Sequence, residues 1–143
     1  MNDKWKFTII TITAALLMMG FMTYSPSSPP NTHELVIMKI DGIWKVVDAA
    51  DHTKFTLKAK KKDVIVWTII GSDASFQFPA NLLDPVDEGD NLTDGYTKYL
   101  KDGKKLKLKV KETAEAGTYE YAVFCSVDGV FAIGGSPPKI IID

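Results

Sequence analysis

The segment Lys105–Lys111 alternates strictly between lysine and an apolar residue. A period of two places every second side chain on one face of a β-strand, so Leu106, Leu108 and Val110 would point inward. Lys54–Lys60 alternates in the same way, and helical periodicity is nearly absent between residues 34 and 143. This pattern restricts the chain to an all-β fold whose strands bury one face.

Other strands are expected between turns rich in Gly, Asp and Pro. They are Glu34–Ile40, Ile43–Val47, Asp63–Ile70, Thr118–Cys125 and Lys139–Ile142. Asp63–Ile70 is rich in Val, Ile and Trp, which is typical of a central strand buried on both faces. Asp41-Gly42 and Asp48–Thr53 are expected as turns, and one helical turn is expected near Tyr96–Leu100. Seven or so short strands predict a Greek-key β-sandwich.

The N-terminus has the pattern expected of an export signal. Lys4 and Lys6 precede Phe7–Tyr24, an uncharged and mostly apolar run that would span about 27 Å as a helix. Residues 1–24 are therefore expected to be a signal peptide or an uncleaved signal anchor, and both alternatives stay open. Residues 25–33 form a Pro/Ser linker, which favours an extended spacer. Because basic residues stay in the cytoplasm, the domain is expected on the periplasmic or cell-surface side, either anchored or secreted.

The charge balance gives no support for nucleic-acid binding. All seventeen basic residues are lysine, and acidic residues outnumber them by one. Nucleic-acid binding favours a net basic surface and usually arginine. We expect the membrane as one partner, through the N-terminal segment, and a protein of the cell envelope as another.

Two segments resemble those of a known family. Lys62-Asp-Val-Ile-Val-Trp67 is similar to a conserved strand of the cupredoxins, and Gly117-Thr-Tyr-Glu-Tyr-Ala-Val-Phe-Cys125 is similar to their cysteine strand. Tyr119, two residues after Gly117, also matches a tyrosine corner. A single cysteine argues against an antibody-type domain, which needs two. The resemblance covers roughly residues 34–143 and implies a cupredoxin-like β-sandwich.

The resemblance also implies where copper ligands would lie. A type 1 copper site takes two histidines, a cysteine and a weak axial ligand such as methionine. The first histidine is expected eight residues after Trp67, where this chain has Ser75, and neither His nor Met follows Cys125. The family spacing from Gly117 would place the cysteine at Val123, on the same strand face as Cys125. Asp128 or Ile133 would stand at the remaining ligand positions, so the copper site is degenerate and no cofactor is expected.

Other candidate sites are weaker. His33 lies beside the linker and His52 in a turn, and a site joining Cys125 to His52 would need an unusual topology. The acidic loop Asp84–Asp94 lacks the ligand spacing of a calcium-binding loop. Ser72 and Ser75 have Asp73 nearby, but no motif places a histidine as their base, so we do not expect an enzyme.

Two functional hypotheses follow. The first is an exported, membrane-tethered domain that acts as a binding or assembly module through the loop Asp84–Asp94 or the loop Cys125–Pro138. The alternative is a noncanonical copper-binding or electron-transfer protein that uses Cys125 with carboxylates such as Asp73 and Asp128.

Overall fold

Val64–Ile69 (β4) is the central strand of the larger sheet. The computed structural model describes residues 28–143, so the predicted signal segment lies outside the described residues. β4 pairs in parallel with Thr32–Ile40 (β1) and antiparallel with Lys105–Val110 (β8). Ile43–Asp48 (β2) and Leu83–Pro85 (β6) extend the sheet, whose order is β2-β1-β4-β8-β6.

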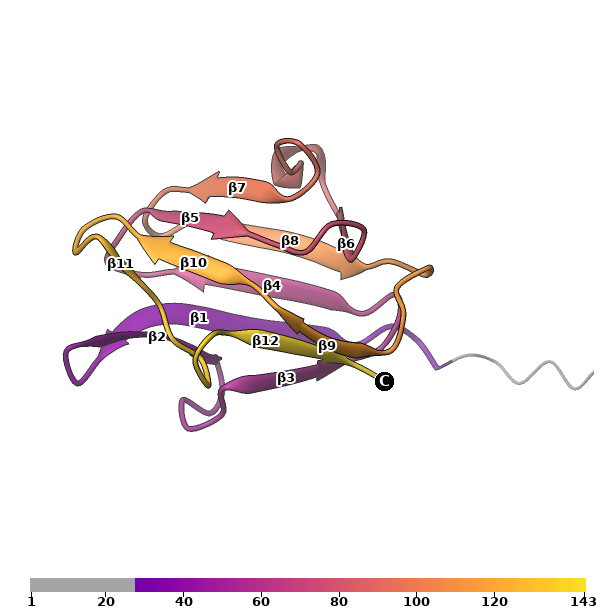
Figure 1. Ribbon diagram of the computed structural model, residues 1–143, viewed down its shortest axis with the longest axis horizontal. Coiled ribbons are helices and arrows are strands. Elements are labelled where there is room, and N and C mark those ends of the chain that lie inside the picture. The colour runs from indigo at the N-terminus through magenta and orange to yellow at the C-terminus, as the bar shows by residue number, and fades with distance from the viewer. Residues whose placement is uncertain (1–27) are drawn as a thin grey trace, which may run out of the picture.

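Two smaller sheets form the other layer. The sheet with order β11-β10-β5-β7 contains Val130–Phe131, Ala122–Cys125, Ala74–Gln77 and Thr97–Leu100. The sheet with order β3-β12-β9 contains Thr56–Ala59, Lys139–Ile142 and Gly117–Glu120. In Figure 1, β10 crosses in front of β4, and the short 3-10 helix Glu88–Asp90 (η1) lies at the far edge. This strand order confirms the predicted all-β Greek-key sandwich.

Three local expectations need correction. The helical turn expected near Tyr96–Leu100 is wrong, because Thr97–Leu100 is strand β7 and pairs with β5. Thr97 and Tyr99 are residue types that favour strands when a partner strand is available. The expected strand Thr118–Cys125 is divided into β9 and β10, which pair with different sheets on either side of Tyr121. β1 begins at Thr32 rather than Glu34, so His33 lies within the strand.

The predicted Asp41-Gly42 turn and the predicted tyrosine corner are both confirmed. Asp41 and Gly42 both have positive φ, at 51° and 79°, and connect β1 to β2. Positive φ at both central residues is the geometry of the tightest hairpin turns. The Tyr119 hydroxyl donates to the Glu115 carbonyl at 2.7 Å, which forms the expected tyrosine corner.

An aromatic cluster around Trp67 fills the space between the layers. Trp67 is fully buried on β4 and packs against Phe76, Phe78 and Tyr121, with ring centroids 5.1–6.3 Å apart. Its indole N–H donates to the Tyr121 hydroxyl at 3.1 Å. Burial raises the pKa of Tyr121 well above its usual value, which keeps the hydroxyl protonated. Within residues 28–143, no helix is long and apolar enough to span a bilayer.

We predict that Tyr121→Phe lowers the free energy of unfolding by about 1–3 kcal/mol, because the buried Trp67 N–H would lose its acceptor. Urea unfolding of the full chain, followed by tryptophan fluorescence, measures this change. Tyr96→Phe is the control, since Tyr96 is 38% exposed and its change should stay within about 0.5 kcal/mol. Equal stability of the two variants would contradict the role assigned to this hydrogen bond.

Candidate metal site and loop surface

Cys125 ends strand β10 and is fully buried. Its partner across the sheet is Ala74, so a methyl group faces the thiol on the inner side. Burial, with a contribution from the Asp128 carboxylate, raises the pKa of the Cys125 thiol to about 11. A thiol in this state is a poor nucleophile and a poor metal ligand, because both roles require the thiolate.

Ser75, the residue at the expected position of the first histidine, lies on the wrong face of the sheet. Ser75 pairs with Phe124 on β10, whereas Cys125 pairs with Ala74. Directly opposed residues of antiparallel strands share a face, so Ser75 points outward and Cys125 points inward. Val123 is also buried and shares the face of Cys125, as the even spacing predicts.

The carboxylates considered as ligands have other partners. Asp73 accepts hydrogen bonds from the Tyr99 hydroxyl and from the Asp102 amide, the latter at 2.8 Å, and these lower the pKa of Asp73. Asp128 accepts from the Lys39 ammonium at 2.8 Å and from the Trp44 indole at 2.6 Å. The same two bonds, the one from Lys39 foremost, lower the pKa of Asp128. Both carboxylates are therefore ionised and already engaged in hydrogen bonds within the protein.

Both histidines lie away from Cys125. His33 Nε2 is 2.8 Å from Asp63 Oδ2, near the start of β1. The loop after Cys125 contacts the other end of this strand, where Asp128 accepts a hydrogen bond from Lys39. His33 and Lys39 are six residues apart on β1, which separates their backbones by about 20 Å. Hydrogen bonds from His33 and two backbone amides hold the pKa of buried Asp63 below its usual value, against the opposing effect of burial.

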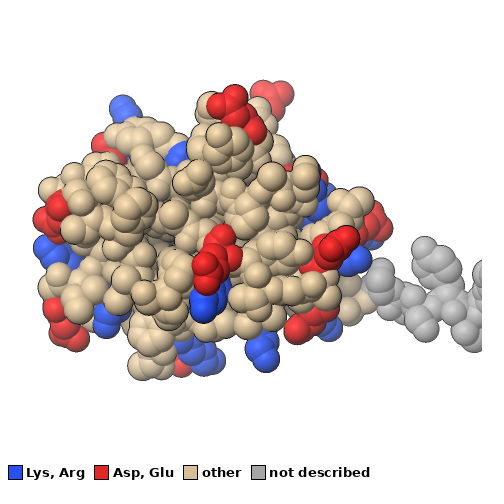
Figure 2. All heavy atoms as spheres, in the orientation of Figure 1, with Lys and Arg blue, Asp and Glu red and all other residues tan. Residues whose placement is uncertain are grey.

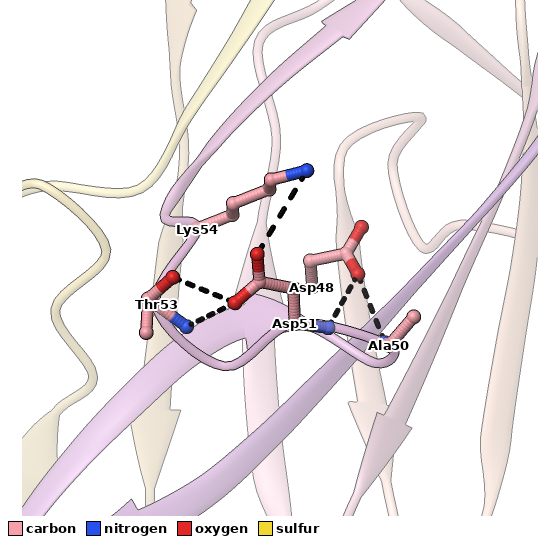
Figure 3. Close-up of polar contacts among 5 residues, drawn as sticks. All are labelled: Asp48, Ala50, Asp51, Thr53 and Lys54. Carbon is pink, nitrogen blue, oxygen red and sulfur yellow. Dashed lines mark hydrogen bonds and ion pairs between the residues drawn. The ribbon is translucent and has the colours of Figure 1, made fainter.

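His52 belongs to a self-contained turn, drawn without it in Figure 3. Asp48 Oδ1 accepts from the amides of Ala50 and Asp51, both at 2.9 Å. Asp51 in turn accepts from the amide and hydroxyl of Thr53 and lies 3.8 Å from the Lys54 ammonium. The turn joins the β1 end near Glu34 through the Ala49 amide, so His52 does not approach Cys125.

The acidic loop Asp84–Asp94 is partly a structural element. Asp90 is buried, and its carboxylate accepts from the amides of Lys107 at 3.1 Å and Asp87 at 3.2 Å. Among residues 28–143, no group of three or more His, Cys, Asp or Glu side chains is placed to hold a metal ion. The donor set around Cys125 therefore does not fit a type 1 copper ion, which needs imidazoles that this end of the sandwich does not supply.

Hydrogen bonds within the protein fix the loop that follows Cys125. Buried Ser72 donates to the Asp73 carbonyl at 2.6 Å and accepts from the Val127 amide at 3.1 Å. The Ser126 amide donates to the same Asp73 carbonyl at 3.0 Å. In the sequence, Ser72 stands out only as a candidate nucleophile. Nothing nearby in the sequence indicates that it holds the loop after Cys125, because its partner Val127 lies 55 residues away.

Several exposed apolar side chains lie on this loop and on the strand after it, with Val130 and Phe131 on opposite faces of β11. We call Val127, Val130, Phe131 and Ile133 the loop patch; Val127 and Phe131 are the most exposed members, at 63% and 64%. Phe131 packs edge-on against Phe124 with ring centroids 5.2 Å apart. Figure 2 shows one face of the molecule, with charged side chains around its edge and an acidic and a basic side chain together near its centre. Four exposed apolar side chains within seven residues make this part of the chain a candidate interaction surface.

No family model matches the chain, and no curated protein matches it. Solved structures with a similar fold include a Cu(I) form of an amicyanin mutant, with a TM-score of 0.41 and 15% identity over 77% of this chain and 82% of that one. An oxidised form of another amicyanin mutant has a TM-score of 0.42 and 17% identity, over 82% of this chain and 95% of that one. Likeness at this level carries no ligand or activity over to this chain.

We predict that Cys125 reacts with a thiol reagent such as Ellman's reagent at pH 8 at least a hundredfold more slowly in the folded protein than in urea, because it is buried and protonated. The matched control is Ser126→Cys in a Cys125→Ala background, which moves the thiol by one residue to an exposed position. The control should react rapidly without urea. Comparable rates at the two positions would contradict the buried placement of Cys125.

Proposed function

We propose that this protein is an exported, membrane-tethered cupredoxin-like domain that binds a protein of the cell envelope through the loop patch. It works without a type 1 copper ion and without enzymatic activity. The observation that carries the proposal is a set of exposed apolar side chains on a loop that hydrogen bonds hold in place.

The composition of the loop patch supports protein binding. Four apolar side chains lie exposed within residues 127–133, and two of them are more than 60% accessible. Exposed apolar side chains cost solubility unless a partner covers them, and aromatic residues are enriched among those that dominate binding energy. Phe131, which packs edge to face against its cross-strand neighbour Phe124, is the expected anchor.

The fixed shape of the loop also supports this role. Asp128 receives hydrogen bonds from β1 and β2, and Ser72 receives one from the loop backbone. A loop that is already ordered loses less conformational freedom when a partner binds. The loop patch therefore meets a partner in a nearly fixed arrangement.

The tether is inferred from the sequence. An apolar run long enough to cross a bilayer precedes an uncharged proline-containing linker, and the domain begins directly after it. Export by this route gives the domain a periplasmic or cell-surface position and brings it close to other envelope proteins.

The alternative, electron transfer or copper handling through Cys125, has no observation in its favour. Its thiol is buried and protonated, and Asp73 and Asp128 are held by other groups. We therefore base the functional test on the loop patch.

We predict that Phe131→Ala weakens partner binding by about tenfold or more, the effect expected for an aromatic anchor at an interface centre. A photo-crosslinking amino acid at Val127 in the full membrane-bound chain identifies the partner, and its yield is then compared with and without Phe131→Ala. Phe55→Ala is the matched control, because Phe55 is 39% exposed but lies against Lys45 outside the loop patch.

The control should leave the crosslink yield unchanged. A partner captured equally well by both variants would show that the loop patch is not the binding surface. A chain that forms no crosslink from Val127 in its own membrane would also contradict the proposal.

A further inference from the structure

A hollow of about 460 Å³ lies on the outer face of the sheet β11-β10-β5-β7. Its floor is made of residues with short or polar side chains, Ser75, Gln77 and Ala122. Aromatic side chains stand on both sides, Phe124 and Phe131 on one and Tyr96 and Tyr99 on the other. We call this feature the aromatic hollow.

The strand register explains the shape of the aromatic hollow. Phe131 pairs with Phe124, Phe124 with Ser75, and Ser75 with Tyr99, so these residues form one row across four strands. The small Ser75 side chain leaves a gap between two aromatic walls. The row spans three strand spacings, or about 14 Å.

Both walls are held in place before any ligand arrives. The Tyr99 hydroxyl donates to Asp73, whose other oxygen accepts from the Asp102 amide at 2.8 Å. On the other side, the rings of Phe124 and Phe131 pack edge to face. Fixed aromatic walls reduce the entropy cost of binding.

The aromatic hollow is suited to an uncharged ligand. Lys98 is the only charged residue among those that line it in the described part of the chain. The Lys98 ammonium is already bonded to the carbonyls of Gly89 and Asn91, the latter at 3.3 Å. Aromatic-lined grooves with polar floors bind proline-rich segments in the polyproline II conformation, because these rigid helices need little further ordering.

The chain itself contains a segment of this kind. Ser25-Pro-Ser-Ser-Pro-Pro30 is uncharged and holds three prolines. In the polyproline II conformation, at about 3.1 Å per residue, five of its residues would cover about 15 Å, which matches the row across the aromatic hollow. The linker of the same copy is directed elsewhere, because Asn31 is fixed beside β4 through Asp63 and Val64. These lie in the opposite layer of the sandwich.

We infer that the aromatic hollow binds the linker segment Ser25–Pro30 of a second copy of this chain. The inference rests on the proposed membrane tether, which confines neighbouring copies to one membrane and raises the effective concentration of their linkers. It deepens the proposed function by naming one assembly partner, the protein itself.

Disulfide crosslinking in the membrane tests the arrangement between copies. One chain carries Ser28→Cys and the other Thr97→Cys, at the edge of the aromatic hollow, both in a Cys125→Ala background. We expect a disulfide between the two chains under mild oxidation. Thr118→Cys, exposed on β9, is the matched control and should crosslink at least tenfold less. Equal yields from Thr97→Cys and Thr118→Cys would overturn the inference.

A peptide titration tests the chemistry of the aromatic hollow. The full chain, with its linker prolines replaced by alanine and its tyrosines fluorinated, is titrated in detergent micelles with a synthetic peptide of residues 25–32. We expect saturable ¹⁹F shifts at Tyr96 and Tyr99 but not at Tyr121. The same peptide with alanine at its prolines should bind at least tenfold more weakly. Ser75→Tyr, which fills the gap, should abolish the shifts, whereas Thr118→Tyr should preserve them.

Three outcomes would overturn the inference: no shift at millimolar peptide, equal binding of the alanine peptide, or shifts caused by a neutral oligosaccharide such as chitotetraose but not by the peptide. A failure here is distinguishable from failure of the proposed function. If photo-crosslinks from Val127 persist and depend on Phe131, while the peptide and disulfide results are negative, only the contact between copies is wrong.

Discussion

Hydrogen bonds to Ser72 and Asp128 determine what this protein presents to its surroundings. They join the loop after Cys125 to the start of β5 and to strands β1 and β2, and so connect the two layers at one end of the sandwich. Each is a modest contact by itself, but buried or charge-assisted bonds of this kind restrict a loop to one conformation. The exposed apolar side chains of the loop patch and the row that ends at Phe131 both depend on this conformation. The loop after Cys125 is thus organised by contacts within the protein.

Much of the fold could be predicted from local patterns. The alternation of lysine with apolar residues in Lys105–Lys111 predicts a strand with one buried face, and the structure has this strand as β8. Tyr119 reports a tyrosine corner because its hydroxyl bonds only four residues back. Strand β7 was missed because Thr97–Leu100 becomes a strand by pairing with β5, a contact between segments far apart in sequence. The break at Tyr121 was missed for a similar reason, since it depends on which sheet each half joins.

The candidate site was less predictable than the fold. Counting eight residues from Trp67 reached Ser75, but only the pairing of β5 with β10 shows that Ser75 faces outward while Cys125 faces inward. A shift of one residue along a strand moves a side chain to the other face, so spacing alone does not establish a ligand set. The outward direction of Ser75 also creates the gap in the aromatic hollow. Ser75, which occupies the expected position of the first copper ligand, forms part of the floor of the aromatic hollow in the structure.

The central claim is that this cupredoxin-like fold is complete without a type 1 copper ion. The most direct measurement is the visible absorption spectrum of the full chain in detergent, together with bound copper per chain, after Cu(II) is added under oxidising conditions and excess metal is removed. We predict no thiolate-to-copper band and no stoichiometric copper, because the Cys125 thiol is buried, protonated and without an imidazole beside it. An intense visible band with one copper per chain, lost in Cys125→Ala, would contradict the account and favour the alternative hypothesis of electron transfer.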